Sequence, residues 1–130
     1  MKPGKVIIPL GAIPEPHEIE TGKFFAALGN DVEFLPPSYM KGVFSPDMLM
    51  NGTRWEIKAP CGDSKRTIEN NYRSAERQSQ NVIFDLRRVK LGEKIAIGYI
   101  KQQFNLRRSK IKRIIVITKD KKYLDLTRKK

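Results

Sequence analysis

The sequence has almost none of the residues that form disulfides or zinc sites. Its 130 residues include one cysteine, Cys61, and one histidine, His17. A single thiol cannot form an internal disulfide, and one thiol with one imidazole is too few for a zinc site. The length is enough to bury a core without such cross-links. We therefore expect one domain over residues 1–130, ending in a short basic tail.

Long apolar runs are also missing. The longest, such as Ile114 to Ile117, are far too short to cross a bilayer. Near the N-terminus, Pro9 interrupts the run Val6 to Ile8 before it can form the apolar segment of a signal peptide. We therefore expect an intracellular protein that acts in the cytoplasm, with no signal peptide, transmembrane segment or membrane partner.

Negative charge is scarce in the second half of the chain. The net charge is +12; residues 1–60 carry six Lys and Arg against seven Asp and Glu, whereas residues 61–130 carry twenty against seven. Such a concentration of positive charge attracts polyanions, most often nucleic acid. An anionic membrane surface is a weaker alternative, because no long amphipathic helix sets Trp and Phe opposite its lysines. Charge alone also fits a ribosome-associated or simply soluble basic protein.

Strands and helices alternate along the chain, which predicts a mixed α/β sheet. We expect helices over 17–28, from 63 or 64 to about 80, and over 93–104. Strands are expected over 31–35, 81–86 and 112–118, with a loop through Tyr39, Gly42 and Ser45. Helical spacing predicts that two sets of side chains face inward: Thr21, Phe24, Phe25 and Leu28 in the first helix, and Ile68, Tyr72 and Ala75 in the second.

A tight hairpin is the most specific local signal. Asn51-Gly52 separates Met48–Met50 from Thr53–Ala59, and this dipeptide is the strongest short-range indicator of a two-residue type I′ turn. With that turn, the register pairs Asp47 with Glu56 across the two strands. The sequence therefore predicts two facing carboxylates.

The next residues of the second strand extend this arrangement. Lys58 projects from the same face as Glu56, whereas Trp55 and Ile57 point the other way, into the core. Facing carboxylates repel one another unless a cation lies between them. Oxygen ligands with an incomplete protein shell are typical of a magnesium site that a substrate phosphate completes.

Such a site predicts phosphodiester hydrolysis. The ion would stabilise charge on the phosphorus and acidify a bound water, and Lys58 would orient that water or assist its deprotonation. The alternative is that Glu56 and Lys58 are ordinary charges on a solvated strand face. Because Asp47 is placed across the hairpin from Glu56, we favour a catalytic metal site over that alternative.

The second expected helix carries a polar stripe. Arg66, Asn70, Arg73 and Arg77 recur at helical spacing, so three guanidinium groups can lie along a phosphate backbone. A solvated helix face is the alternative for any single arginine. We assign Arg66, Arg73, Arg77, Arg87 and Arg88 to nucleic-acid binding.

Two motifs carry a family resemblance. Pro46-Asp47 followed by Glu56-Ile57-Lys58 resembles the motif of the PD-(D/E)xK nuclease superfamily. More narrowly, three segments of residues 17–88 resemble the C-terminal tRNA-nuclease domain of contact-dependent growth-inhibition (CdiA) toxins and free-standing relatives on bacterial mobile elements: HEIETGKFFAALGNDVEFL, SPDMLMNGTRWEIKAP and RQSQNVIFDLRR. The resemblance implies a restriction-endonuclease-like mixed sheet flanked by helices.

The resemblance also implies residue roles. Asp47, Glu56 and the backbone carbonyl of Ile57 would bind Mg²⁺, for which Mn²⁺ can substitute, and Lys58 would be the catalytic lysine. Glu18 matches the acid of the first helix and Gln78 the polar helix position beside the site.

Each of these assignments has an alternative. Glu20 is a second candidate for the helix acid, and Glu18 can instead complement the helix N-terminus. Gln78 can be a surface amide. The number of metal ions, one or two, stays open.

Three functional hypotheses follow. The first is a metal-dependent nuclease acting on tRNA. The second is the same chemistry on DNA, in restriction or in processing of a mobile element, and the third is a non-catalytic nucleic-acid-binding module. No zinc finger or helix-turn-helix is visible, which favours a substrate recognised by shape. An immunity protein as partner is implied by the resemblance alone.

Overall fold

Seven strands form one mixed sheet in the computed structural model, which describes residues 2–37 and 47–127. The strands follow one another across the sheet in chain order. They are β1 Val6–Ile7, β2 Val32–Phe34, β3 Met48–Met50, β4 Thr53–Lys58, β5 Asn81–Asp85, β6 Arg113–Ile117 and β7 Tyr123–Thr127. Three helices accompany them: α1 Pro16–Ala27, α2 Lys65–Glu76 and α3 Glu93–Phe104.

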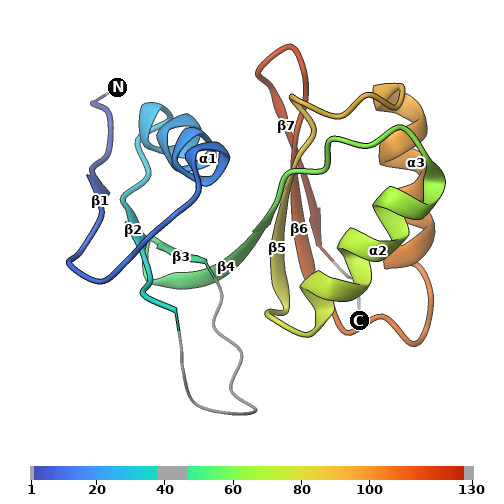
Figure 1. Cartoon of the computed structure of the whole chain (residues 1–130), viewed down its shortest axis with the longest axis horizontal. Helices are drawn as coiled ribbons and strands as arrows, with labels where there is room; N and C mark the ends of the chain where they lie inside the picture. The colour runs from blue at the N-terminus through green and yellow to red at the C-terminus, as the bar shows by residue number, and fades with distance from the viewer. Residues whose placement is uncertain (1, 38–46, 128–130) are drawn as a thin grey trace.

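The centre of the sheet is parallel and its margins contain antiparallel pairs. Strands β4, β5 and β6 run parallel, and α2 and α3 are the crossovers between them (Figure 1). Strands β2, β3 and β4 pair antiparallel, as do β6 and β7, while β1 runs parallel to β2. The predicted mixed α/β sheet is confirmed.

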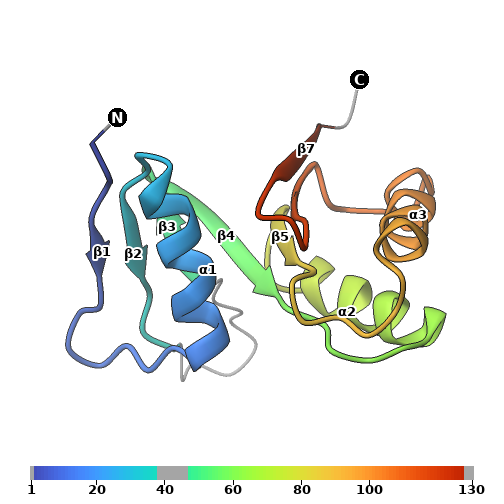
Figure 2. The same ribbon diagram turned by 90° about the horizontal axis from the view of Figure 1, so that it is seen from above.

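The helices cover opposite faces of the sheet. Val82 and Phe84 of β5 pack with α2 and α3, whereas Ile83 between them belongs to the core formed with α1. Because side chains alternate along a strand, these two cores lie on the two faces. Figure 2 shows β4 crossing between the half of the molecule that holds α1 and the half that holds α2 and α3. Residues of β4 can therefore meet side chains from both halves.

The predicted hairpin is confirmed in turn type and register. Asn51 and Gly52 have φ of 51° and 85°, so both central residues are left-handed, as a type I′ turn requires. Leu49 pairs with Arg54, and Met48 with Trp55.

Several element boundaries differ from the sequence prediction. Helix α1 ends at Ala27, and Leu28, predicted to face inward, is 39% exposed. Ser64 caps α2 as expected, but the helix ends at Glu76, about four residues early, because the chain turns there to enter β5. Helix α3 has the predicted bounds.

Two strands were not predicted. β1 has two residues and β7 is largely exposed, so neither carries a strong apolar pattern. Both are edge strands, held mainly by backbone pairing. The predicted loop through Tyr39, Gly42 and Ser45, together with Pro46 and the last three residues of the basic tail, lies outside the described residues. Within residues 2–37 and 47–127, no helix combines the length and apolarity needed to cross a membrane.

Candidate active site

Asp47 and Glu56 meet where the hairpin register places them. Asp47 directly precedes β3, and its Oδ2 accepts the backbone N–H of Ile57 at 2.8 Å. Its side chain also hydrogen-bonds to that of Glu56, which is 5% exposed. Trp55 and Ile57 are buried in the core on the other face. The predicted partition of β4 side chains is confirmed.

Glu18 joins these two acids from α1. Its side chain hydrogen-bonds to Asp47 and also accepts the backbone N–H of Glu15 at 2.7 Å, which closes the start of the helix. Glu20 is exposed instead and forms an ion pair with Lys23 at 3.6 Å. Helix capping and membership of the acid cluster therefore coexist at Glu18, and the geometry brings Glu18 rather than Glu20 to the site.

Burial is the main reason that all three acids have raised pKa values. Burial, and then the neighbouring Asp47, raise the pKa of Glu18 to about 7 despite the Glu15 N–H. Burial and the charge of Glu56 raise the pKa of Asp47 to about 6. The pKa of Glu56 is also raised by burial, although Lys58 opposes the shift. Near neutral pH this cluster holds protons unless a cation replaces them.

Lys58 lies against the acids and against α2. Its Nζ is 3.2 Å from Oε2 of Glu56 and donates to Oγ of Ser74 at 3.0 Å. The Lys58 side chain is 19% exposed, so these contacts form in a largely dry environment. Ser74 of α2 and Glu56 of β4 therefore both hold the ammonium group.

Ser74 is the site residue that sequence reasoning missed. Gln78, proposed for the polar helix position, lies beyond the end of α2, so its predicted place on the helix is wrong. Its catalytic role stays a prediction. Ser74 lies one turn earlier, between the buried Tyr72 and Ala75. Its position on the helix, between Tyr72 and Ala75, which spacing predicts to face inward, is the signal in the sequence that could have indicated it.

The donor set fits a hard cation. Asp47 and Glu56 supply carboxylate oxygens, the ligands that Mg²⁺ prefers, and the carbonyl of Ile57 is the third predicted ligand. Within the described part of the chain, no group of three or more His, Cys, Asp or Glu side chains is spaced to hold a metal ion, so a site here would use two carboxylates. Two carboxylates and one carbonyl leave positions for water and a substrate phosphate, as magnesium sites commonly do.

Cavities lie on both sides of the start of α1. One, of about 280 Å³, is lined by both Glu18 and Asp47 but not by Glu56 or Lys58. The other, of about 270 Å³, is lined by His17, Glu20, Ala59, Asp85, Arg87 and Arg88. A ligand can reach Glu18 and Asp47 through the first.

The five predicted nucleic-acid-binding arginines fall into two groups. Arg66, Arg73 and Arg77 are exposed along the outer side of α2, as the stripe predicted. Arg87 instead forms a bidentate pair with Asp85, with Nη2 2.7 Å from Oδ2, and lies over the ring of Phe24. Exposed Arg88 donates from Nε to the carbonyl of Ala59. Arg87 therefore has a structural contact whether or not it binds phosphate.

Comparisons with known proteins bear on the family and the fold of the chain. Residues 45–123 match the family described as contact-dependent growth inhibition CdiA C-terminal domain. The fold is similar to a chain of the CdiA-CT/CdiI toxin and immunity complex from Burkholderia pseudomallei, with a TM-score of 0.68 and 18% identity over 95% of this chain and 100% of that one. No curated protein sequence matches at a significant level. Since the family match covers more than half of the sequence, the chain belongs to the CdiA C-terminal domain family.

Proposed function

We propose that the chain is a metal-dependent nuclease of the PD-(D/E)xK type that hydrolyses phosphodiester bonds in RNA, with tRNA as substrate. The observation that carries the proposal is the acid cluster: Glu18, Asp47 and Glu56 come from separate segments of the chain and meet beside the half-buried Lys58. Opposed carboxylates that are partly or fully buried and have raised pKa values are unfavourable for stability alone, which favours a functional reason for them.

The side chains divide the chemistry between them. Asp47 and Glu56, with the Ile57 carbonyl, would hold Mg²⁺, which when bound would stabilise negative charge on the phosphate and acidify a water. Lys58 would orient the attacking water. Ser74 and Glu56 hold the ammonium group of Lys58 in place. Glu18 would steady Asp47 from α1.

The cationic surface supports a nucleic-acid substrate. Arg66, Arg73 and Arg77 form an exposed stripe suited to a phosphate backbone, and α2 also supplies Ser74 to the site. No groove-reading module is evident in the described fold, so recognition by shape is expected. Incubation of the chain with tRNA and with duplex DNA, side by side, separates this proposal from a DNA endonuclease.

The first prediction concerns the assigned acids and lysine. With Mg²⁺ and tRNA, Asp47→Ala and Lys58→Ala should each slow cleavage by at least about 10²-fold, because each removes a group that acts directly at the phosphate. Glu18→Ala should slow it measurably, whereas Glu20→Ala on the same helix should not. Cleavage fragments are followed by gel electrophoresis with time.

A loss of cleavage counts only if the variants still fold. All variants should retain the circular dichroism of the parent. If Asp47→Ala and Lys58→Ala cut as fast as the parent, the assigned site is wrong. Salt-sensitive RNA binding with no cleavage under Mg²⁺ or Mn²⁺ would instead support a non-catalytic binding module.

We also propose that a neutralising partner protein binds this chain. The similar Burkholderia structure is a complex of a toxin with its immunity protein. With a net charge of +12, this chain would attract an acidic partner. Co-expression with a candidate acidic protein encoded nearby should yield a complex that no longer cleaves tRNA. If the chain cleaves tRNA equally fast in the presence of that protein, the candidate is rejected.

A further inference from the structure

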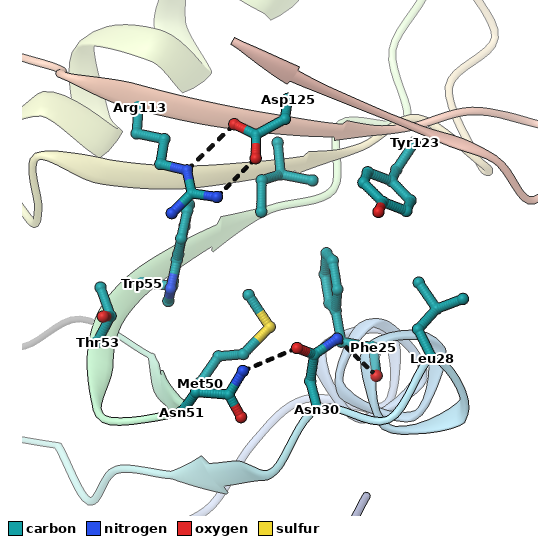
Figure 3. Close-up of a pocket in the computed structure, with 11 residues that line it drawn as sticks. Phe25, Leu28, Asn30, Met50, Asn51, Thr53, Trp55, Arg113, Tyr123 and Asp125 are labelled. Atoms are coloured by element: carbon teal, nitrogen blue, oxygen red, sulfur yellow. Dashed lines mark hydrogen bonds and ion pairs between the residues drawn. The ribbon is translucent and has the colours of Figure 1, made fainter. Parts of the chain in front are cut away.

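A pocket of about 210 Å³ lies away from the acid cluster (Figure 3). It is bounded by the C-terminal end of α1, the tip of the β3–β4 hairpin, and strands β6 and β7. Its lining joins the two halves of the molecule, since α1 and the hairpin belong to one half and β6 and β7 to the other (Figures 1 and 3). No step of the proposed cleavage uses it.

One wall contains a buried donor without an acceptor. Trp55 is 1% exposed, and its Nε1–H is the one buried side-chain donor that finds no partner among the described residues. Buried tryptophan N–H groups usually have an acceptor, because leaving a buried donor unpaired is unfavourable. A molecule that carries an acceptor into this pocket can provide one.

Two amides add further donors. Asn51 uses one N–H to reach Oδ1 of Asn30 at 2.8 Å, and Asn30 uses one N–H to reach the carbonyl of Phe25 at 3.1 Å. Each amide group has two N–H bonds, so each keeps one with no acceptor in the described part of the chain. The pocket is therefore rich in donors.

The remaining walls offer flat surfaces. Tyr123 is 50% exposed at the rim. The guanidinium of Arg113 lies 5.3 Å from the centre of the Trp55 ring, and Asp125 holds it there through bonds of 3.1 and 2.6 Å. Tyrosine rings and guanidinium planes are the surfaces on which unpaired bases stack.

We propose that this pocket binds an unpaired nucleobase of the RNA substrate, through the acceptor atoms on the edge of the base. The proposal rests on the proposed function in taking RNA as the ligand. A base combines a flat aromatic body with carbonyl and ring-nitrogen acceptors, which match the stacking surfaces and the three donors. An apolar ligand would leave those donors unpaired.

The position of the pocket suits a nucleotide near the cleaved bond. Helix α1 has Glu18 in its first turn, and its C-cap residue, Leu28, lines the pocket. Ten residues of helix span about 15 Å. A base in the pocket would thus hold the RNA a few nucleotides from the phosphate under attack and select a loop over a duplex.

The test uses the only tryptophan of the chain as its probe. The full chain, without divalent metal, is titrated with each of the four nucleoside 5′-monophosphates and with ribose 5-phosphate, and Trp55 fluorescence is recorded. We expect a saturable change with at least one nucleotide and none with ribose 5-phosphate. Tyr123→Ala should weaken that binding by about fivefold or more, since it removes a stacking ring.

Leu124→Ala is the matched control, because Leu124 is also exposed on β7 but does not line the pocket. The proposal would be overturned if no nucleotide changes the fluorescence, or if ribose 5-phosphate changes it as much as the nucleotides do. It would also be overturned if Tyr123→Ala and Leu124→Ala lose nucleotide affinity equally. A response only to an acidic partner protein would overturn it too, in favour of a protein ligand. Asp47→Asn should bind nucleotides like the parent, so failure of the cleavage site is distinguishable from failure of the pocket.

Discussion

At the scale of single residues, Asp47 connects the parts of the candidate site. Its carboxylate accepts the Ile57 N–H and contacts both Glu18 and Glu56. Since the folded protein raises the pKa values of Glu18 and Asp47 to about 7 and about 6, the native state binds more protons than the unfolded state between about pH 4 and 7. These groups therefore lower the free energy of unfolding as the pH rises through that range.

Because Asp47 faces other carboxylates, we expect Asp47→Asn to stabilise the metal-free protein. At pH 8 in EDTA, the free energy of unfolding of the variant should be about 1 to 2 kcal/mol higher than that of the parent. The substitution removes a repelling charge and keeps an acceptor for the Ile57 N–H. The difference should shrink at pH 5, where Asp47 is largely protonated. Urea unfolding at both pH values measures it.

Mg²⁺ should affect the stability of the parent and of Asp47→Asn differently. Added Mg²⁺ should stabilise the parent and leave Asp47→Asn nearly unchanged. Asp31→Asn, which alters an exposed acid outside the cluster, is the control and should not stabilise. A parent that is more stable than Asp47→Asn in EDTA at pH 8 would contradict the proposed repulsion.

Ser74 is a positioning residue, because it acts through the ammonium group of Lys58. Ser74→Ala removes one acceptor from that group, so we expect kcat for tRNA cleavage to fall about tenfold with little change in KM. Ser74→Thr keeps a hydroxyl at this position and should restore kcat. An unchanged kcat in Ser74→Ala would mean that the contact is only structural.

At the scale of elements, the site depends on how α1 is attached to the sheet. The hydroxyl of Thr21, buried in α1, donates to Oδ2 of Asp85 at 2.7 Å, and Asp85 is also bound by Arg87. Burial alone would raise the pKa of Asp85, but these hydrogen bonds outweigh it and lower the pKa. The ionised carboxylate on β5 thus fixes α1, and with it Glu18.

Removal of this attachment should weaken both fold and activity. Thr21→Val leaves a buried carboxylate with one partner fewer, so the free energy of unfolding should fall by about 1 to 3 kcal/mol. Cleavage should fall as well, because Glu18 lies one turn away on the same helix. Urea unfolding and the tRNA assay measure the two effects. Thr127→Val on the exposed edge strand is the control, and equal stabilities of the two variants would reject the anchoring role.

At the scale of the whole molecule, charge is divided between the halves of the chain. The second half has thirteen more Lys and Arg than Asp and Glu, since it carries twenty against seven. Two of these arginines, Arg66 and Arg73, are exposed on α2, and a third, Arg77, is the exposed C-cap residue of that helix. Phosphate contacts of this kind release counterions, so binding should weaken steeply with salt.

The exposed arginines should set how strongly tRNA binding depends on salt. Arg66→Ala, Arg73→Ala and Arg77→Ala should each reduce the slope of log affinity for tRNA against log salt by about one. Lys2→Ala, outside this surface, should leave the slope unchanged. Filter binding with an inactive Asp47→Ala background measures the slope. Slopes that do not differ among these variants would place the RNA elsewhere.

Local chemistry made much of the site predictable. The turn type follows from Asn51-Gly52, because these residues tolerate left-handed backbone, and a two-residue turn sets the partners of β4. Alternation then sends Glu56 and Lys58 to one face. The arginine stripe follows from helical periodicity in the same way. The two edge strands were missed because backbone pairing holds them, and pairing leaves little trace in side-chain pattern.

The sequence by itself determined the hairpin, its facing acids, the exposed arginines and the mixed α/β class, because each depends on neighbours within one or two elements. Only the tertiary structure decided that Glu18 rather than Glu20 reaches Asp47, that Ser74 holds Lys58, and that Trp55 lines a pocket with Arg113. Those contacts join segments far apart in the chain. They depend on how helices pack on a twisted sheet, which periodicity does not specify.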